Sequence, residues 1–391
     1  MSDKIRILHV ITRLEPGGSS RNTVDSCAAQ AEYADVALLA GPHPDSASLL
    51  KLLPPAVKYV EIPDLQREIR FSSDRRALLA IKREIENFKP DIVHTHTSKA
   101  GALGRMAAAL YNTAASKALV VHTPHGHLLY GYYGFFRTRL FKNAERFLGL
   151  FTDHFIALTE GEKRESAAAG IGVERQWEVI HSGVNFASPA SPASKAALGL
   201  PADCVAAGTI ARLEPVKGVE HLVRAAALLK DEVPALRTVI IGGGALEKPL
   251  KDLAARLGAA DRVLFTGFRH DAADLLPALD IYVQPSLNEA MGRAPLEAQA
   301  LGLPAIVTGV CGLPETIRAG ETGLIAKPGD PADLAGAVKT LALAPQLRAR
   351  MGAAARDWAL GGDEAGLPRF GPESMNLKLK KFYNKILEKK S

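Results

Sequence analysis

Residues 280–304 read DIYVQPSLNEAMGRAPLEAQALGLP, a stretch with the pattern of one strand–loop–helix unit. Its start, 280–286, is a short apolar run, which is typical of a strand buried on both faces of a sheet. We expect a loop carrying Glu289 to follow, and then a helix carrying Glu297. Gly292 would let the backbone approach a ligand closely and offer it N–H groups. The two carboxylates could be the acid and base of glycoside hydrolysis, or both could accept hydrogen bonds from sugar hydroxyls.

Apolar runs alternate with helical patterns along the whole chain, which predicts an α/β protein with parallel sheets between layers of helices. A length of 391 residues favours two domains, which would leave a ligand-binding cleft between them. The segment 188–201 is rich in proline and serine and is interpreted as a linker or an edge loop. The expected strands are 5–12, 35–41, 57–62, 91–96, 118–124, 154–159 and 177–184 in the first half, and 205–213, 237–244, 262–268, 280–286, 304–309 and 322–329 in the second.

Composition narrows the class of protein. Hydrophobic residues make up 47% and charged residues 23%, which is typical of a folded globular chain. No apolar run reaches the length of a membrane span, and the N-terminus lacks the pattern of a signal peptide. Cys27, Cys204 and Cys311 are far apart in the sequence and are expected to be buried free thiols, which suits a reducing cytoplasm. The net charge of +6 is mild: it could favour anionic substrates or a membrane surface, but it decides neither by itself. No nucleic-acid partner is expected.

Two loops carry the residues expected to bind an anion. In GTIARLEPVKGVEHLV (208–223), Arg212 follows a strand and Lys217 precedes a helix. Two cations beside the free N–H groups of a helix N-terminus would form a receptor for a diphosphate, although solvated surface charges are the alternative. Gly17 and Gly18 stand between the first strand and the following helix, where the backbone could also approach a ligand.

Four histidines follow or end two of the expected strands: His94 and His96 in VHTHTSKAG, and His122 and His125 in VVHTPHGH. They could be structural, and a metal site would require their ring nitrogens to converge without help from any carboxylate in these motifs. We therefore expect no metal and interpret His125, beside Gly126, as a hydrogen-bond donor at the rim of the cleft.

Together these motifs resemble glycosyltransferase family 4, group 1, whose members have the GT-B fold of two Rossmann-like domains facing across a cleft. The resemblance rests on the Glu-x7-Glu pair Glu289 and Glu297, on ARLEPVKG, on the N-terminal PGG, on TPHGH and on HSGVN (181–185), and it covers nearly the whole chain. The segments 93–108 and 122–134 are similar to enzymes of cell-surface polysaccharide and lipopolysaccharide assembly. The chain departs from the family in EAMG, where Glu-Gly-Phe-Gly is usual, and this affects the expected shape of the sugar pocket.

The resemblance implies a role for each matching position. Glu297 would hold the ribose hydroxyls and Glu289 the hydroxyls of the donor sugar, while Arg212 and Lys217 would bind the diphosphate. His125 would contact the transferred sugar from the opposite domain. The other expected donor-binding positions are Gly17, Gly18, Phe268, Arg269, Met291, Gly292, Arg293 and Ala294. The expected domains are 1–186 and 187–374, with a helix at 375–391 that packs back on the first domain through Leu379, Phe382, Tyr383, Ile386 and Leu387.

The implied activity is that of a retaining, metal-independent hexosyl- or N-acetylhexosaminyl-transferase. No cofactor is expected, because the nucleotide sugar is a substrate. UDP is the expected nucleotide, although GDP and ADP remain open, and the acceptor could be a saccharide or lipid-linked. A nucleotide-sugar 2-epimerase and a non-catalytic subunit of a glycosylation complex are the alternatives.

The stretch 128–151, LLYGYYGFFRTRLFKNAERFLGLF, interleaves aromatic and basic residues. It could bury its apolar side in the first domain, or it could bind an anionic membrane surface weakly from the cytoplasm. We expect a combination of the two, in which Leu140, Phe147 and Leu148 pack inward. In this combination Tyr132, Tyr133, Phe135 and Phe136 form a loop near the mouth of the cleft.

Overall fold

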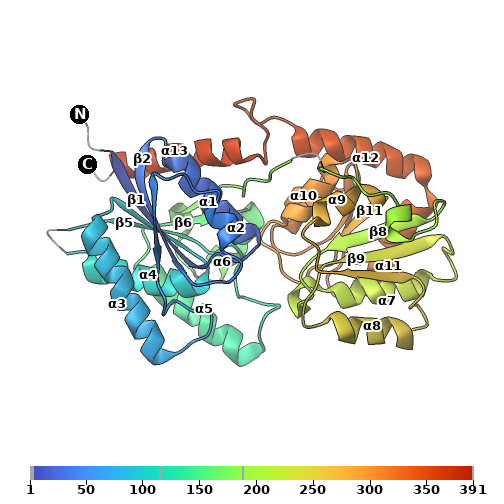
Figure 1. Cartoon of the computed structure of the whole chain (residues 1–391), viewed down its shortest axis with the longest axis horizontal. Helices are drawn as coiled ribbons and strands as arrows, with labels where there is room; N and C mark the ends of the chain where they lie inside the picture. The colour runs from blue at the N-terminus through green and yellow to red at the C-terminus, as the bar shows by residue number, and fades with distance from the viewer. Residues whose placement is uncertain (1–3, 114–115, 187–188, 390–391) are drawn as a thin grey trace. The chain divides into compact units, whose positions relative to one another are not determined.

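The computed structural model describes residues 4–113, 116–186 and 189–389 (Figure 1). Their contacts divide the chain into two compact units. The first unit comprises Met1–Leu129, Tyr133–Gly183 and Pro372–Ser391, and the second comprises Tyr130–Tyr132 and Val184–Gly371. The C-terminal segment therefore belongs with the N-terminal half of the chain.

The first unit is built on a seven-stranded parallel sheet of order β3-β2-β1-β4-β5-β6-β7. Its strands are β1 (Ile5–Arg13), β2 (Ala34–Gly41), β3 (Val57–Glu61), β4 (Ile92–His96), β5 (Leu119–Thr123), β6 (His154–Ala157) and β7 (Trp177–Val179). Its helices are α1 (Gly18–Gln30), α2 (Ala47–Leu50), α3 (Phe71–Phe88), α4 (Ser98–Tyr111), α5 (Phe135–Gly149), α6 (Glu160–Ala168), η1 (Glu174–Gln176) and α13 (Pro372–Glu388).

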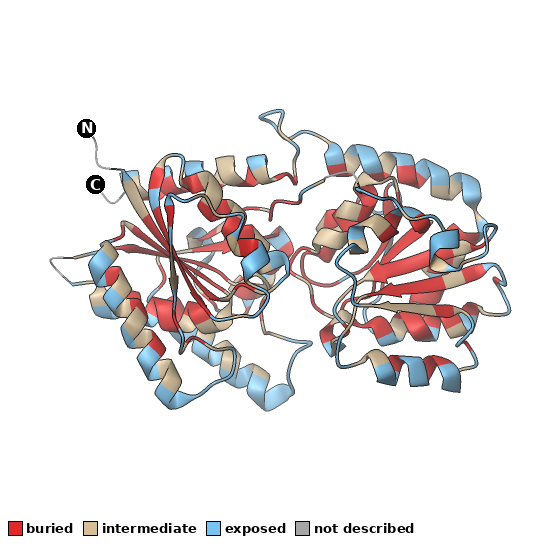
Figure 2. Ribbon diagram, in the orientation of Figure 1, coloured by how far each residue is buried: buried red, intermediate tan, exposed pale blue. Residues whose placement is uncertain are grey.

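Alternate residues of these strands build two cores, one on each face of the sheet. Ile7 and Ile11 face a core closed by α1 and α13, whereas Leu8 and Val10 face a core closed by α3 and α4. Burial on both faces explains why the strands read as continuous apolar runs, and Figure 2 shows them buried. The apolar stripe of α13 packs as expected, with Leu379, Phe382, Tyr383 and Ile386 buried in the α1 core.

The second unit repeats the design with a six-stranded parallel sheet of order β10-β9-β8-β11-β12-β13. Its strands are β8 (Val205–Ile210), β9 (Leu236–Ile241), β10 (Val263–Gly267), β11 (Ile281–Gln284), β12 (Ala305–Thr308) and β13 (Gly323–Ala326). Its helices are α7 (Val219–Leu229), α8 (Glu247–Arg256), α9 (Ala272–Leu275), α10 (Arg293–Ala300), α11 (Pro331–Leu343) and α12 (Pro345–Leu360), with short 3₁₀ turns η2 (Ala196–Leu198), η3 (Pro215–Lys217), η4 (Leu276–Ala278) and η5 (Leu313–Thr316). Two Rossmann-like parallel sheets are the fold class expected from the sequence.

Both sheets reverse their strand order at one point, between β1 and β4 in the first unit and between β8 and β11 in the second. In open α/β sheets, ligands bind beyond the carboxyl ends of the strands at such a switch point. In each unit, the loops after the two strands at the switch point are therefore the expected place for a ligand. The segment around 190–200, interpreted as a linker or an edge loop, packs on the second unit, because Ala193 N donates to Asp274 O and Lys195 pairs with Asp280.

Helix α5 differs from the expectation in two ways. Phe135 and Phe136 are its first residues and do not lie in a loop. Leu140 and Phe147 were expected to pack inward but are 67% and 57% exposed, while Leu148 is buried as expected. Only a narrow edge of the helix therefore meets the core.

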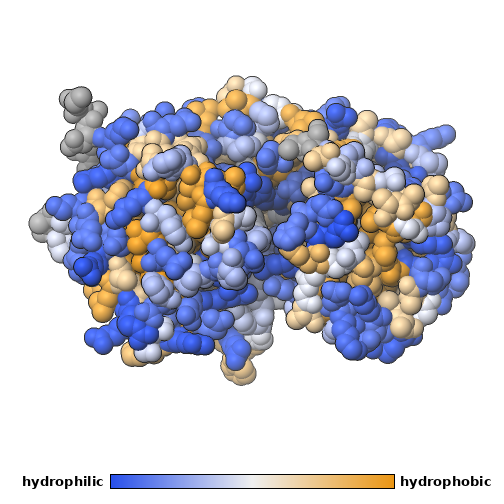
Figure 3. Space-filling view, in the orientation of Figure 1, coloured by the Kyte–Doolittle hydropathy of each residue, from blue (hydrophilic) through white to orange (hydrophobic). Residues whose placement is uncertain are grey.

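Within the described residues, no helix is both long enough and apolar enough to cross a membrane. On the face shown in Figure 3, hydrophobic residues are interspersed with hydrophilic ones. Cys27, Cys204 and Cys311 are buried free thiols, as expected.

Candidate active site

The switch point of the second sheet brings together two of the residues singled out in the sequence. Lys217 ends the η3 turn after β8, and Glu289 lies in the loop after β11. Lys217 Nζ is 2.5 Å from Glu289 Oε2, and both side chains are largely buried. The structure therefore pairs the cation expected at the diphosphate with the carboxylate expected at the donor sugar.

Gly218 allows the loop with Lys217 to approach the β11 loop. It has a φ of 61°, and a Cβ added there would lie 2.1 Å from the carbonyl oxygen of Pro285. Any side chain would push the two loops apart, so glycine is required for this contact. Leu287 N also donates to Val216 O at 2.8 Å, which ties the loops together beside the ion pair.

A series of buried side-chain hydrogen bonds leads from Tyr282 to the carboxylate of Glu289. Tyr282 OH donates to Gln284 Oε1 at 2.7 Å, and Gln284 Nε2 donates to Ser286 Oγ at 2.9 Å. Ser286 Oγ in turn lies 3.3 Å from Glu289 Oε2. Because each member of the series is fixed by the next, the carboxylate has a defined position before any ligand arrives. These polar residues were not selected from the sequence, because they lie in a stretch that was interpreted as a buried apolar strand.

Glu297 lies on the first turns of α10, as the strand–loop–helix pattern predicted. Burial raises the pKa of its carboxyl group above the usual value, and Arg293 one turn earlier acts in the opposite direction. Arg293 Nε is 3.9 Å from Glu297 Oε1, so the two charges attract but are not in close contact. A half-buried carboxylate of this kind is well placed to accept hydrogen bonds from hydroxyl groups.

The N-terminus of α10 can bind an anion. Gly292 precedes the helix with a φ of 79° and provides no capping side chain. The N–H groups of the first turn point away from the helix, as at any helix N-terminus, and the helix dipole favours an anion there. A Cβ on Gly292 would lie 2.7 Å from Leu313 Cδ1, which explains the glycine. Ala290 and Met291, where the chain departs from the EGFG pattern, are buried.

Arg212 also follows β8 but has a different environment from Lys217. Its side chain is half-exposed, with Nη1 3.3 Å from Glu214 Oε1. The glycine turn after β9 packs directly under its loop, because a Cβ on Gly242 would lie 2.0 Å from Ala211 O and one on Gly244 would lie 2.7 Å from Leu213 O. Gly242 and Gly244 therefore allow close contact between two backbones.

The other expected donor-binding residues lie on separate loops. Phe268 follows β10 and is 65% exposed, and Arg269 beside it forms a two-pronged ion pair with Asp271. Gly18 begins α1 in the first unit, and Gly17 caps that helix without a side-chain hydrogen bond. The N–H groups in the first turn of α1 thus resemble those of α10.

His125 lies at the carboxyl end of β5 in the first unit, with a φ of 55°, an unusual conformation for a residue with a side chain. Burial lowers the pKa of its ring to about 3. The loop is fixed by Glu162 on α6, whose carboxylate accepts hydrogen bonds from Gly126 N and Leu158 N, both at 2.7 Å. His96 Nδ1 lies 3.0 Å from His125 Nε2.

The four histidines of the two sequence motifs do not form the group that was considered as a metal site. His94, His96 and His125 lie on one side of their strands with His9, whereas His122 bonds to Thr95 in the other core. The involvement of His9 was missed, although a histidine within the apolar run IRILHVIT could have indicated it. Glu162, in a polar helix, gave no comparable signal.

Most of the chain matches models of known protein families. Residues 16–188 match the model of Glycosyltransferase Family 4, and residues 191–358 match that of Glycosyl transferases group 1. The putative glycosyltransferase EpsD of Bacillus subtilis is 34% identical over 295 residues, covering 73% of this chain and 76% of that protein. The UDP-Gal:alpha-D-GlcNAc-diphosphoundecaprenol alpha-1,3-galactosyltransferase of Escherichia coli is 32% identical over 283 residues, covering 68% and 70%.

The fold is also similar to that of a solved protein. Anabaena Alr3699/HepE, crystallised in complex with UDP, superposes with a TM-score of 0.77 at 22% identity, covering 97% of this chain and 100% of that one. The same Anabaena protein has been crystallised with UDP-glucose.

Proposed function

We propose a reaction for this chain, which belongs to glycosyltransferase family 4 and is a transferase enzyme. It moves a sugar from a nucleotide sugar to an acceptor hydroxyl with retention of configuration. The observation that supports this proposal most is the Lys217–Glu289 ion pair at the switch point of the second sheet, in the loop that leads into the N-terminus of α10. A cation, a carboxylate and the N–H groups of a helix N-terminus are the chemistry that a nucleoside diphosphate sugar requires.

In this proposal each residue has one task. Lys217 and Arg212 bind the diphosphate and stabilise the charge that grows on it as it leaves. Glu289 accepts hydrogen bonds from the sugar and Glu297 from the ribose, while the N–H groups of Arg293 and Ala294 approach the phosphates. The acceptor hydroxyl attacks from the face that the diphosphate leaves, so no protein nucleophile is assigned.

The remaining donor positions complete the proposal. Gly17 and Gly18 bring the N-terminus of α1 to the ligand, and the backbone of Phe268 and Arg269 meets the base. Met291 and Gly292 form the loop between the two glutamates. His125 contacts the transferred sugar.

We propose a UDP-sugar as donor and a lipid-linked acceptor, in the assembly of a cell-surface polysaccharide or lipopolysaccharide. The Escherichia coli relative is named for a UDP-galactose donor and an acceptor on diphosphoundecaprenol. The Anabaena protein of similar fold binds UDP. Thermal-shift measurements with UDP, GDP and ADP would test the choice of base. A ligand at 100 times its Kd adds about 2.7 kcal/mol of stability, so the preferred diphosphate should give a clear increase in Tm.

A panel of radiolabelled nucleotide sugars separates this proposal from its rivals. Transfer of label to an acceptor supports the transferase. Formation of the C2 epimer without an acceptor would indicate an epimerase, and binding without turnover would indicate a non-catalytic subunit. The intact Lys217–Glu289 pair favours an active transferase over such a subunit.

We propose that transfer does not depend on a metal ion, because Lys217 and Arg212 can neutralise the diphosphate. Activity should then survive dialysis against EDTA. Loss of activity that manganese or magnesium restores would contradict this part of the proposal.

We further propose that the enzyme works in the cytoplasm and binds weakly to the inner face of the membrane through α5. Phe135 and Phe136 are 73% and 85% exposed at the start of this helix. The acid Glu145 is paired with the buried Arg105, so Arg137 and Arg139 face solvent without an acid on the same helix to offset them. Exposed aromatic rings beside basic charge suit the headgroup layer of an anionic membrane.

A further inference from the structure

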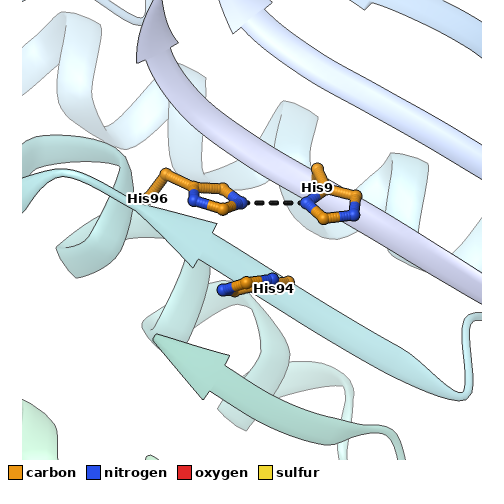
Figure 4. A group of neighbouring side chains, drawn as sticks. All are labelled: His9, His94 and His96. Atoms are coloured by element: carbon orange, nitrogen blue, oxygen red, sulfur yellow. Dashed lines mark hydrogen bonds between the residues drawn. The ribbon is translucent and has the colours of Figure 1, made fainter. Parts of the chain in front are cut away.

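The first unit contains a buried hydrogen-bond chain that ends at His125. Gln30 Oε1 at the end of α1 lies 2.7 Å from His9 Nε2, and His9 Nδ1 lies 2.8 Å from His96 Nε2. His96 Nδ1 lies 3.0 Å from His125 Nε2. The chain thus crosses the β1–β4 switch point and reaches the loop after β5. Figure 4 shows its central bond, between His9 and His96, with the ring of His94 beside it.

His9, His94 and His96 are close enough to suggest a metal centre, since one ring nitrogen from each lies within 4.8 Å of the others. Their hydrogen bonds indicate otherwise. His94 Nδ1 is 2.6 Å from Tyr383 OH, and His94 Nε2 is 2.8 Å from Thr123 Oγ1. His9 and His96 use both ring nitrogens within the chain. A metal ion would have to displace these bonds, so we interpret the group as a hydrogen-bonded network.

The three histidine rings of this hydrogen-bond chain are neutral at physiological pH. Burial lowers the pKa of His9 to about 4 and that of His125 to about 3. Burial and the neighbouring histidines lower the pKa of His96 well below its usual value. A neutral imidazole has one N–H and one lone pair, so each ring must donate one of its bonds and accept the other.

This requirement leaves only two arrangements of hydrogens, one the reverse of the other, and Gln30 selects between them. Its carbonyl oxygen faces His9 and can only accept, so His9 Nε2 donates. His9 Nδ1 then accepts from His96 Nε2, and His96 Nδ1 accepts from His125 Nε2. The hydrogen of His125 is therefore on Nε2. Its Nδ1 is left with a lone pair, and this buried atom has no hydrogen-bond partner among the described residues.

We infer that Gln30, His9 and His96 are positioning residues that fix His125 as the Nε2–H tautomer, with Nδ1 presented as a constant hydrogen-bond acceptor. This differs from the sequence-based interpretation of His125 as a hydrogen-bond donor, because the single N–H of its neutral ring is directed toward His96. This step rests on the proposed function: the group that donates a hydrogen bond to His125 Nδ1 is a hydroxyl or amide N–H of the transferred sugar. A phosphate oxygen also carries lone pairs and would be repelled at the same place. By fixing this tautomer, the hydrogen-bond chain makes His125 favour the sugar end of the donor over its phosphate end.

The tautomer can be measured in the ligand-free protein by long-range ¹⁵N–¹H correlation spectra of histidine side chains, with His125→Asn used to assign the His125 signals. We expect the wild type to show a protonated Nε2 and an unprotonated Nδ1. Gln30→Met, which keeps the volume and removes the acceptor, should produce a detectable Nδ1–H population. Thr123→Val is the matched control, because it removes a buried bond of His94 outside the chain and should leave the His125 tautomer unchanged. A protonated Nδ1 in the wild type, or an unchanged tautomer in Gln30→Met, would overturn the inference.

If Gln30→Met does not fold, Gln30→Glu provides the second variant, because its carboxylate keeps an acceptor for His9 and should preserve the wild-type tautomer.

Calorimetry tests which ligand His125 binds. Gln30→Met should bind UDP-glucose about tenfold more weakly than the wild type, as for one lost hydrogen bond, and should bind UDP equally well. Equal losses for both ligands would contradict the role at the sugar. A wild type that binds neither ligand would contradict the proposed UDP donor, and the spectra would still decide the tautomer.

Discussion

Lys217 Nζ lies 2.5 Å from Glu289 Oε2 in the ligand-free protein, so the cation proposed for the diphosphate is already held by the carboxylate proposed for the sugar. The pair keeps two partly buried charges satisfied until the donor arrives. A diphosphate then has to compete with Glu289 for Lys217, and Glu289 becomes available to sugar hydroxyls. Binding of the phosphates and of the sugar would thereby be coupled through one contact.

The first prediction concerns the two cations. Lys217→Ala and Arg212→Ala should each lower kcat by about 100-fold or more, because each removes positive charge from the leaving diphosphate. Steady-state kinetics with a saturating donor measure this effect. Lys248→Ala is the control, because Lys248 is 85% exposed and pairs with Asp252 on its own helix. Near-normal turnover in both site variants would show that neither cation acts on the leaving group.

Substitution of the two glutamates should have different effects on ligand binding. Glu297→Ala should weaken binding of free UDP, because the ribose loses its acceptor. Glu289→Ala should leave UDP binding less affected and should impair binding and turnover of the intact donor. Calorimetry with UDP and with the nucleotide sugar compares the two variants, and the reverse pattern would mean that the two roles are exchanged.

Much of the fold could be predicted from the sequence, because strands buried on both faces need continuous apolar runs. All the expected strand positions hold strands, although several are shorter than expected. Residues 180–184, for example, leave the sheet after Val179, and Val184 N bonds to Phe370 O. Helix α5 was partly mispredicted because helical spacing identifies an apolar side without showing whether another element covers it. Leu140 and Phe147 remain exposed for this reason.

The candidate site was predictable where a motif was local and hidden where it depended on strand register. Glu289, Gly292 and Glu297 stand within nine residues of one another, so their loop and helix could be read directly from the sequence. His9 and His96 are 87 residues apart and meet only because β1 pairs with β4. Strand order is a property of the whole sheet, and the sequence around either histidine does not contain it.

The buried histidines should make the first unit sensitive to acid. Burial lowers the folded-state pKa of His9 to about 4, whereas in the unfolded chain the pKa is near the ordinary histidine value of 6.5. The unfolded state therefore binds more protons between these values, so stability is complete above pH 6.5 and is lost as the pH falls toward 4. Each such ring contributes a slope of up to about 1.4 kcal/mol per pH unit.

Urea unfolding of the wild type and of His9→Gln at several pH values between 4 and 7.5 measures this slope. The variant should show a shallower fall in the free energy of unfolding over the same window, whatever its stability at pH 7.5. Parallel curves for the two proteins would show that His9 does not contribute to acid sensitivity.

Helix α13 should be required for the stability of the first unit. Truncation before Leu377 removes Leu379, Phe382, Tyr383 and Ile386 from the α1 core and should lower Tm strongly. Tyr383→Phe keeps the packing and removes only the hydroxyl bonded to His94, so it should cost about 1 kcal/mol. Calorimetric melting compares the two changes. An unchanged Tm after truncation would show that the helix contributes nothing to the fold.

The last prediction concerns the exposed side of α5, which carries the proposed attachment to the membrane. Vesicles of phosphatidylcholine with phosphatidylglycerol should sediment the protein at low salt, and high salt should weaken the binding because it shortens the Debye length. Phe135→Ser combined with Phe136→Ser should abolish most of the binding, since these rings are the most exposed apolar residues of the helix. Leu228→Ser combined with Leu343→Ser is the matched control, because it removes exposed apolar side chains from the second unit. Absence of binding to anionic vesicles at low salt would refute membrane attachment, and equal binding by the Phe135/Phe136 variant would place the attachment elsewhere on the surface.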